Sequence, residues 1–349
     1  MLFSRVRIDA IGYELPAEAV TTSVLEAELA TVYSLFNLPK DFIQSLTGII
    51  ERRFWPAGVD LIEKATCAAE HALASAQIRG SDLDVVIYAG VCRAHIEPAM
   101  ACEIGHRLGV RAQTMVYDLS NACLGVLNGI VDLAAKIETG LIRSGIVIAC
   151  ESSRDIVEQT IARLRKNPQF NLLRDSIATF TGGSGAVAVV VTDGSFAKPN
   201  GHQVKIATWM NAVSHFDLCK WDYKPHATET HLFEQMLTTD AANVMRHGVE
   251  LGKKTWDAFL SESKWTAQTI TRVIPHQVGK SNREHILKAL DLSRDQDVST
   301  FSLLGNMGSV AVPLTAALAS ERGQMTAGDR VAMTGIGSGL NCLMIGVTW

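Results

Sequence analysis

The sequence predicts an α/β fold in which helices cover mostly parallel or mixed β-sheets. Three observations support this class: short apolar runs rich in β-branched residues recur along the chain, amphipathic segments separate them, and one series of elements occurs twice. The composition is compatible with a large core, because 47% of the 349 residues are hydrophobic and 19% are charged.

Several apolar runs have the composition of buried strands. They are residues 85–91 (VVIYAGV), 146–150 (IVIAC), 186–192 (AVAVVVT) and 331–335 (VAMTG). Runs without apolar and polar alternation are typical of strands covered on both faces. Residues 1–12, which alternate apolar and charged side chains, predict a first strand, and residues 342–349 (CLMIGVTW) predict a last one.

Helical patterns lie between these strands. Residues 61–77, 229–260 and 279–290 mix apolar and polar positions as surface helices do. Residues 123–135 are apolar nearly all round, which predicts a buried helix. Polar stretches at 152–178 and 193–228 (which include KNPQFN and AKPNGHQ) interrupt the order, and we expect them to form insertions or lids.

The repeated series indicates two equivalent halves. In each, an apolar helix, a turn and a strand follow one another, and three positions match at a separation of 183 residues: Cys123 with Asn306, Gly140 with Gly323, and Gly145 with Gly328. We therefore expect an N-terminal half at 1–195 and a C-terminal half at 196–349. If a pseudo-dyad relates them, equivalent loop ends meet near its axis, which would bring Cys123 close to Asn306.

Charge and cysteine usage exclude several classes of protein. A net charge of −4 provides no basic excess for a phosphate backbone, so we expect no nucleic acid partner. The chain shows neither a long apolar run nor a signal-peptide pattern at its N-terminus, so we expect no membrane span. Seven cysteines without a CxxC pair argue against disulfides and a metal site, and indicate reduced thiols in the cytoplasm.

Three residues at loop ends can carry acyl-transfer chemistry. Cys123 follows a strand-like segment and begins the apolar helix, where the helix dipole favours a thiolate. His276 follows the strand-like TRVI, and Asn306 lies between Gly305 and Gly308, which permit a tight turn. Together they could supply a nucleophile for the acyl group and two hydrogen-bond donors for an enolate.

A glycine-rich stretch, residues 335–341 (GIGSGLN), follows a predicted strand. What comes next reads as another strand rather than a helix, so the stretch is not a dinucleotide fingerprint. Backbone N–H groups in such a loop could form an oxyanion hole with the amide of Cys123.

These motifs resemble the thiolase superfamily, in particular its ketoacyl synthase III branch. The resemblance spans the chain and rests on TGIIERR at 47–53, NAC at 121–123, PHQ at 275–277, GN at 305–306 and the terminal GIGSGLN. It implies a five-layer αβαβα thiolase fold of two duplicated halves and a homodimer. It also implies a catalytic triad of Cys123, His276 and Asn306, with oxyanion-binding amides at Cys123 and Ser338.

The pair Glu97 and Pro98 resembles the sequence of the olefin-biosynthesis thiolases of the OleA type. Those enzymes condense two fatty acyl-CoA molecules head to head. The similarity implies that Glu97, acting across the dimer interface, removes the α-proton of the second thioester. The reaction would be a non-decarboxylative Claisen condensation to a 2-alkyl-3-oxo fatty acid through an acyl-cysteine. It would use coenzyme A thioesters as substrates and no permanently bound cofactor.

Other interpretations remain open. Glu97 could instead be a surface carboxylate that caps the helix after Pro98. The enzyme could be a decarboxylating 3-oxoacyl-ACP synthase III that uses a malonyl thioester, with CoA or acyl carrier protein as the donor. A non-catalytic partner subunit of a thiolase-fold heterodimer is disfavoured, because Cys123, His276 and Asn306 are all present.

Overall fold

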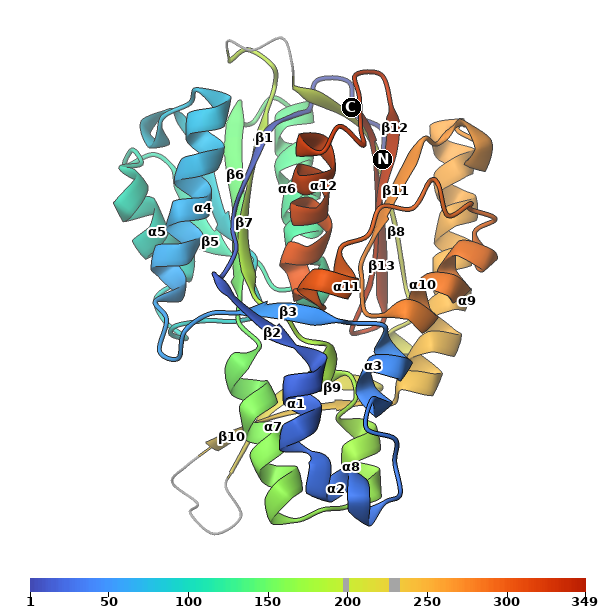
Figure 1. Ribbon diagram of the computed structural model, residues 1–349. Coiled ribbons are helices and arrows are strands. Elements are labelled where there is room, and N and C mark those ends of the chain that lie inside the picture. The colour runs from blue at the N-terminus through green and yellow to red at the C-terminus, as the bar shows by residue number, and fades with distance from the viewer. Residues whose placement is uncertain (197–200, 226–232) are drawn as a thin grey trace.

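A computed structural model of the protein describes residues 1–196, 201–225 and 233–349. Its centre is a nine-stranded sheet with the order β11-β12-β13-β8-β1-β7-β6-β4-β5 (Figure 1). The strands are β1 (Arg7–Glu14), β4 (Val85–Tyr88), β5 (Met115–Asp118), β6 (Ser144–Glu151), β7 (Gly185–Thr192), β8 (His202–Asn211), β11 (Arg272–Pro275), β12 (Arg330–Gly337) and β13 (Asn341–Thr348). The predicted α/β class is confirmed.

Eight of the nine strands form two series with the same order and directions, and β5 extends the first series by pairing parallel with β4. In the first series, β1 and β6 each pair antiparallel with β7, and β6 pairs parallel with β4. In the second, β8 and β12 each pair antiparallel with β13, and β12 pairs parallel with β11. The series meet where β1 pairs with β8. This repetition agrees with the offset in the sequence, while the division between residues 195 and 196 stays a prediction.

Three layers of helices alternate with the two strand series (Figure 1). The central layer is α6 (Gly125–Glu138) with α12 (Ala311–Glu321), and the outer layers are α4 (Leu61–Ala76) with α5 (Met100–Leu108) and α9 (Ala241–Ser263) with α10 (Lys280–Ala289). The core cluster around α6 and α12 includes apolar side chains of both strand series. The five layers are those that the resemblance implied, and the buried helix predicted at 123–135 is α6.

Close packing of α4 on the first strand series depends on a glycine in β1. A Cβ atom at Gly12 would lie 2.3 Å from the carbonyl oxygen of Ala68 and 2.3 Å from the amide nitrogen of Ala72. Only a residue without a side chain permits this approach.

Shorter elements lie below the sheet in Figure 1 and form the floor under the strand ends. They are α1 (Thr22–Glu28), α2 (Ala30–Leu35), α3 (Phe42–Thr47), α7 (Arg154–Lys166), α8 (Phe170–Asp175), the paired strands β2 (Glu18–Thr21) and β3 (Glu51–Phe54), and the hairpin of β9 (Cys219–Pro225) and β10 (Phe233–Thr239). A separate cluster of buried apolar residues holds α1, α2, α3, α7 and α8 together.

Two predictions about the middle of the chain were wrong. The helix predicted at 229–260 begins only at Ala241, after Asp240 caps it, and the residues before it form β10, whose pairing with β9 decides its structure. Residues 229–232 lie outside the described residues. The polar stretch at 193–228 contains β8, a central strand, because its pairing with β13 outweighs its polar composition. Residues 197–200 of AKPNGHQ are also not described.

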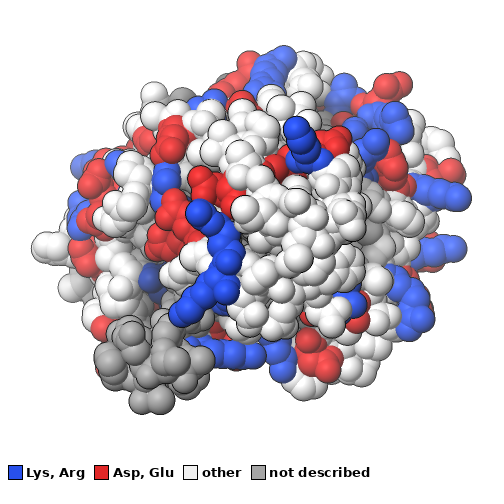
Figure 2. Space-filling view, turned by 60° about the horizontal axis from the view of Figure 1, so that its bottom comes forward, with Lys and Arg blue, Asp and Glu red and all other residues white. Residues whose placement is uncertain are grey.

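The surface of the face shown in Figure 2 carries basic and acidic side chains side by side around a broad uncharged area. This mixture presents no continuous basic surface on that face, in keeping with the net charge of −4. Across the described parts of the chain, none of the helices has the length and apolar character needed to cross a membrane.

Candidate active site

One cavity of about 340 Å³ brings together four of the five residues that the sequence singled out. Cys123, His276, Asn306 and Ser338 all line it, although they come from widely separated parts of the chain. Its other walls include the start of α7, the β9–β10 hairpin, the segment after β4, residues 178–182, and parts of α9 and α10. The expected proximity of Cys123 and Asn306 is therefore realised.

Cys123 lies in the tight turn that joins β5 to α6. The turn is a short 3₁₀ helix (Ala122–Leu124), and Ala122 before the cysteine has a φ of 44°. A non-glycine residue in this left-handed region stores backbone strain, which is frequent at functional positions. Gly125 lets α6 begin close to β4, since a Cβ there would lie 2.0 Å from the carbonyl oxygen of Ala89.

The cavity holds Cys123 as a neutral thiol. Burial, with smaller contributions from the nearby Cys219 and Glu151, raises the pKa of Cys123 to about 12. The expectation that the helix dipole favours a thiolate was therefore wrong, because loss of water outweighs the partial charge of the helix end. The resting thiol must lose its proton during the reaction rather than before it.

His276 follows the last residue of β11, and its backbone N–H donates a 2.7 Å hydrogen bond to the carbonyl of Thr334. Burial lowers the pKa of His276 to about 4, so the ring is neutral near pH 7. Its Nδ1 atom is buried and meets no hydrogen-bond partner among the described residues. A neutral imidazole can accept a proton from a thiol or donate an N–H to a substrate oxygen.

Gln277, the residue after His276, connects β11 to the segment that leads to Asn306. Its side-chain oxygen accepts hydrogen bonds from the N–H groups of Thr300 (2.6 Å) and Phe301 (2.8 Å). Its amide group donates to the hydroxyl of Thr315 at 3.1 Å. Within the PHQ motif, His276 lines the cavity and Gln277 anchors the adjacent backbone through these hydrogen bonds.

Asn306 lies in a turn that both flanking glycines shape, as expected. Gly305 and Gly308 have φ values of 67° and 54°, and a Cβ on Gly305 would lie 2.6 Å from the carbonyl oxygen of Thr181. Asn306 donates its N–H to that carbonyl at 2.7 Å and accepts from the N–H of Gly183 at 2.9 Å. Its side-chain oxygen accepts from the N–H of Gly308 at 3.0 Å, which leaves the NH₂ group for a ligand.

Ser338 lies in the turn between β12 and β13, next to the nucleophile. A Cβ on the preceding Gly337 would lie 3.7 Å from the Cβ of Cys123, so the backbone of this turn passes close to the cysteine. The absence of a side chain at Gly337 leaves room for this approach. This proximity is what an oxyanion hole built from the N–H groups of Cys123 and Ser338 requires.

Glu97 lies outside the cavity of its own chain. It is exposed in the segment between β4 and α5, beside Ile96, whose exposed fraction is 97%. The carboxylate of Asp118 accepts hydrogen bonds from the N–H groups of Met100 and Ala101, both at 3.0 Å, at the start of α5. Asp118 therefore caps this helix, and the interpretation of Glu97 as its cap was wrong.

Glu151, which the sequence did not single out, also lines the cavity. It is the last residue of β6, and only 4% of it is exposed. A charged residue at the end of the apolar run 146–150 was a signal that could have drawn attention to it.

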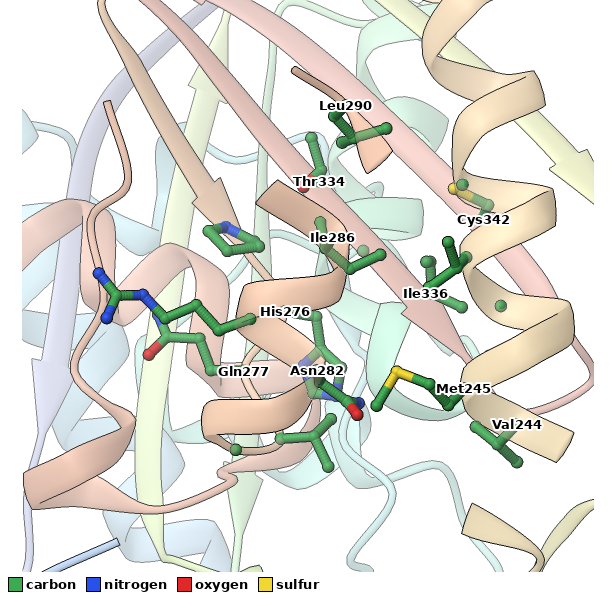
Figure 3. Close-up of a pocket in the computed structure, with 18 of the residues that line it drawn as sticks. Val244, Met245, His276, Gln277, Asn282, Ile286, Leu290, Thr334, Ile336 and Cys342 are labelled. Atoms are coloured by element: carbon green, nitrogen blue, oxygen red, sulfur yellow. The ribbon is translucent and has the colours of Figure 1, made fainter. Parts of the chain in front are cut away.

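A second, smaller cavity of about 90 Å³ adjoins the first on the side of α9 and α10. Figure 3 shows His276 and Asn282 beside it, with Ile336, Met245 and Ile286 among its apolar walls. His276, Asn282 and Ile336 line both cavities. An apolar space thus continues past the imidazole.

The chain is similar to several known proteins. Residues 260–349 match the family model described as 3-Oxoacyl-[acyl-carrier-protein (ACP)] synthase III C terminal. The chain is 45% identical to the acyl-CoA:acyl-CoA alkyltransferase of Shewanella oneidensis and 28% identical to that of Xanthomonas campestris, with 100% of each chain covered in both cases.

Solved structures resemble the chain over its whole length. Cerulenin-bound OleA of Xanthomonas campestris matches with a TM-score of 0.93 and 28% identity, covering 100% of this chain and 98% of that one. The 3-oxoacyl-(acyl carrier protein) synthase III, FabH, of Xanthomonas oryzae matches with a TM-score of 0.92 and 27% identity, with 100% of both chains covered. These likenesses confirm the predicted thiolase fold.

Substituted forms of the Xanthomonas campestris protein have also been solved, with changes at a glutamate, a cysteine or a histidine. The substituted glutamate precedes the substituted cysteine by the same number of residues as Glu97 precedes Cys123.

Proposed function

This chain belongs to the acyl-CoA:acyl-CoA alkyltransferase family of thiolase-fold condensing enzymes, and we propose that it joins two fatty acyl-CoA molecules head to head. The reaction is a non-decarboxylative Claisen condensation that yields a 2-alkyl-3-oxo fatty acid. The observation that carries the proposal is the 45% identity over the full chain, together with Cys123, His276 and Asn306 in one cavity.

In the first half-reaction, Cys123 takes an acyl group from the first thioester. The sulfur attacks the carbonyl carbon, and His276 accepts the thiol proton, as its neutral state allows. The N–H groups of Cys123 and Ser338 stabilise the oxyanion. The intermediate collapses to the acyl-cysteine, and coenzyme A leaves with the proton.

In the second half-reaction, the α-carbon of a second acyl-CoA becomes the nucleophile. A carboxylate removes its α-proton, and His276 and Asn306 donate hydrogen bonds to the enolate oxygen. The α-carbon attacks the acyl-cysteine, and the bond between the carbonyl carbon and the sulfur of Cys123 breaks. The departing sulfur takes up a proton in place of the one that the carboxylate removed, and the carboxyl group loses its proton, so both groups return to their starting states. Water then hydrolyses the 3-oxo thioester to the free acid and coenzyme A.

We assign the base to Glu97 of a second copy of the chain. The exposed position of Glu97 and Ile96 supports this assignment, as does the shared glutamate-to-cysteine spacing in the Xanthomonas campestris protein. The segment that carries Glu97 is tied to the edge strand β5, because Arg93 pairs with Asp118. An unpaired edge strand can pair with the same strand of another copy, so a homodimer would bring this segment to a neighbouring cavity.

The cellular setting forms part of the same proposal. All seven cysteines are free, which suits a reducing cytoplasm. A head-to-head product of two fatty chains suits the biosynthesis of olefins and other long-chain hydrocarbons.

The test is a product assay with purified protein and a long-chain acyl-CoA, in the absence of malonyl-CoA. We expect mass spectrometry to detect the 2-alkyl-3-oxo acid and a thiol assay to detect released coenzyme A. The Cys123→Ala variant is the control, and it should form neither. Strict dependence on malonyl-CoA with release of carbon dioxide would replace this proposal with a decarboxylating synthase.

A further inference from the structure

Glu151 is a buried carboxylate at the cavity that none of the steps above uses. It ends β6, and within the described parts of the chain it forms no ion pair with Lys, Arg or His. A buried carboxylate without a cation is stabilised only by the hydrogen bonds that it accepts. Those hydrogen bonds therefore indicate what the residue does.

Three donors from two distant segments converge on this carboxylate. Its Oε1 atom accepts hydrogen bonds from the N–H of Val91 at 3.0 Å and from the hydroxyl of Ser309 at 2.6 Å. Its Oε2 atom accepts from the N–H of Cys92 at 3.1 Å. A Cβ on Gly308 would lie 3.3 Å from Oε1, so a larger residue there would press on the carboxylate.

Each segment leads to a residue of the proposed mechanism. Val91 and Cys92 begin the segment that carries Glu97. Ser309 follows Gly308, whose N–H orients the side chain of Asn306. The carboxylate of Glu151 therefore connects two parts of the chain. One is the turn that holds Asn306, and the other is the start of the segment that carries Glu97.

We propose that Glu151 is a positioning residue for the condensation step, which it serves by fixing the Asn306 turn and the start of the Glu97 segment relative to each other. The inference rests on the proposed function. In a homodimer, Asn306 serves the cavity of its own chain and Glu97 serves that of the other copy. Glu151 thus links one element of each cavity.

A carboxylate suits this position better than its amide counterpart. All three partners of Glu151 donate hydrogen bonds, and an ionised carboxylate only accepts them. In Glu151→Gln, the NH₂ group would face at least one of these donors, so one contact would be lost and the two segments would shift. A displacement of about 1 Å at reacting groups can cost on the order of 100-fold in rate.

The experiment separates the two half-reactions in Glu151→Gln. Acylation of Cys123 is followed as the first-turnover release of coenzyme A and by intact-protein mass, and condensation is followed as steady-state product formation. We expect acylation to be at least as fast as in the wild type, because the change removes a negative charge that raises the pKa of Cys123. We expect kcat for condensation to fall by roughly 10- to 100-fold, with little change in KM. Glu70→Gln, an exposed carboxylate on α4, is the matched control and should change neither step.

Ser309→Ala provides a second, milder variant. It removes one of the three donors and leaves the backbone contacts of Glu151 in place. We expect the same selective loss of condensation at a smaller size, about tenfold or less. Should Glu151→Gln fail to fold, this variant decides the question.

Equal losses in acylation and condensation would mean a purely structural role, and an unchanged condensation rate in a folded variant would also overturn the inference. The wild-type reaction in the same assay tests the proposed function separately. If the wild type needs malonyl-CoA, the proposed function fails, while the same variants measured with malonyl-CoA still decide the role of Glu151.

Discussion

The cavity around Cys123 and the segment around Glu97 differ in how far a single chain completes them. Cys123, His276 and Asn306 lie at the ends of core elements, where backbone hydrogen bonds and glycine turns fix them. Glu97 and Ile96 project into solvent from a loop. One chain therefore brings the residues proposed for acylation together, whereas the residue proposed as the base for condensation lies on the outside of the same chain.

Removal of the nucleophile should have the largest effect. In Cys123→Ala no acyl-cysteine can form, so both half-reactions stop at the first step. We expect product formation to fall by on the order of 10⁴-fold or more, and the acyl adduct to disappear from the mass spectrum of the intact protein. An adduct that persists would place the acyl group on another residue, with Cys92 and Cys219 the first candidates because both line the cavity.

The effect of burial on the pKa of Cys123 can be measured by alkylation of its thiol. Because burial raises the pKa of Cys123 to about 12, its thiolate fraction at pH 7 should be roughly 1,000-fold below that of a thiol at the ordinary value of 9. Labelling with iodoacetamide should therefore be slow at pH 7 and rise about tenfold per pH unit, without a plateau below pH 10. The exposed Cys102 is the internal reference. A plateau near pH 8 would mean that the free cavity holds enough water to support a thiolate.

Local patterns drew attention to Cys123, His276 and Asn306, and the family resemblance assigned their roles. Cys123, His276 and Asn306 each follow a recognisable strand or glycine turn, so the chemistry of the loop end could be read from a few neighbouring residues. The local pattern at Glu151 shows only a charged residue at the end of an apolar run. The role proposed for it depends on contacts with Val91 and Ser309, which are far away in the sequence.

Two wrong predictions, the helix over β10 and the thiolate at Cys123, also arose because distant contacts do not show in a local pattern. The sequence around β10 has a helical pattern, but its pairing with β9, which a local pattern does not show, makes it a strand. The protonation state of Cys123 depends on burial by the whole cavity rather than on its place at a helix start.

Loss of the base should affect only the second half-reaction. In Glu97→Ala the α-proton of the second thioester has no acceptor, so condensation should fall by about 10²- to 10⁴-fold while acylation of Cys123 proceeds normally. Trapped acyl-enzyme, measured by mass after incubation with acyl-CoA, checks this. If the same variant also lost acylation, Glu97 would serve both half-reactions, and the proposed division between the Cys123 cavity and the Glu97 segment would be wrong.

Loss of the enolate donor should be the smaller effect within the cavity. Asn306→Ala removes one of two hydrogen bonds to the enolate oxygen, which is worth on the order of 100-fold in kcat. Acylation should be affected much less, because the oxyanion amides of Cys123 and Ser338 remain. The ratio of the two rates, measured as for Glu97→Ala, shows whether Asn306 acts in condensation alone.

The smallest departure from the wild-type rate is expected for a mixture of two variants that are each inactive alone. Cys123→Ala lacks the nucleophile and Glu97→Ala lacks the base, so neither homodimer can condense. After exchange of subunits in equal amounts, about half of the dimers are mixed, and each has one cavity with both groups if Glu97 acts in the other copy's cavity. Activity should then recover to about a quarter of the wild-type rate. If Glu97 acts within its own chain, no cavity in the mixture contains both groups and activity stays at the level of the single variants. The outcome thus decides whether the exposed segment completes its own cavity or that of a neighbour.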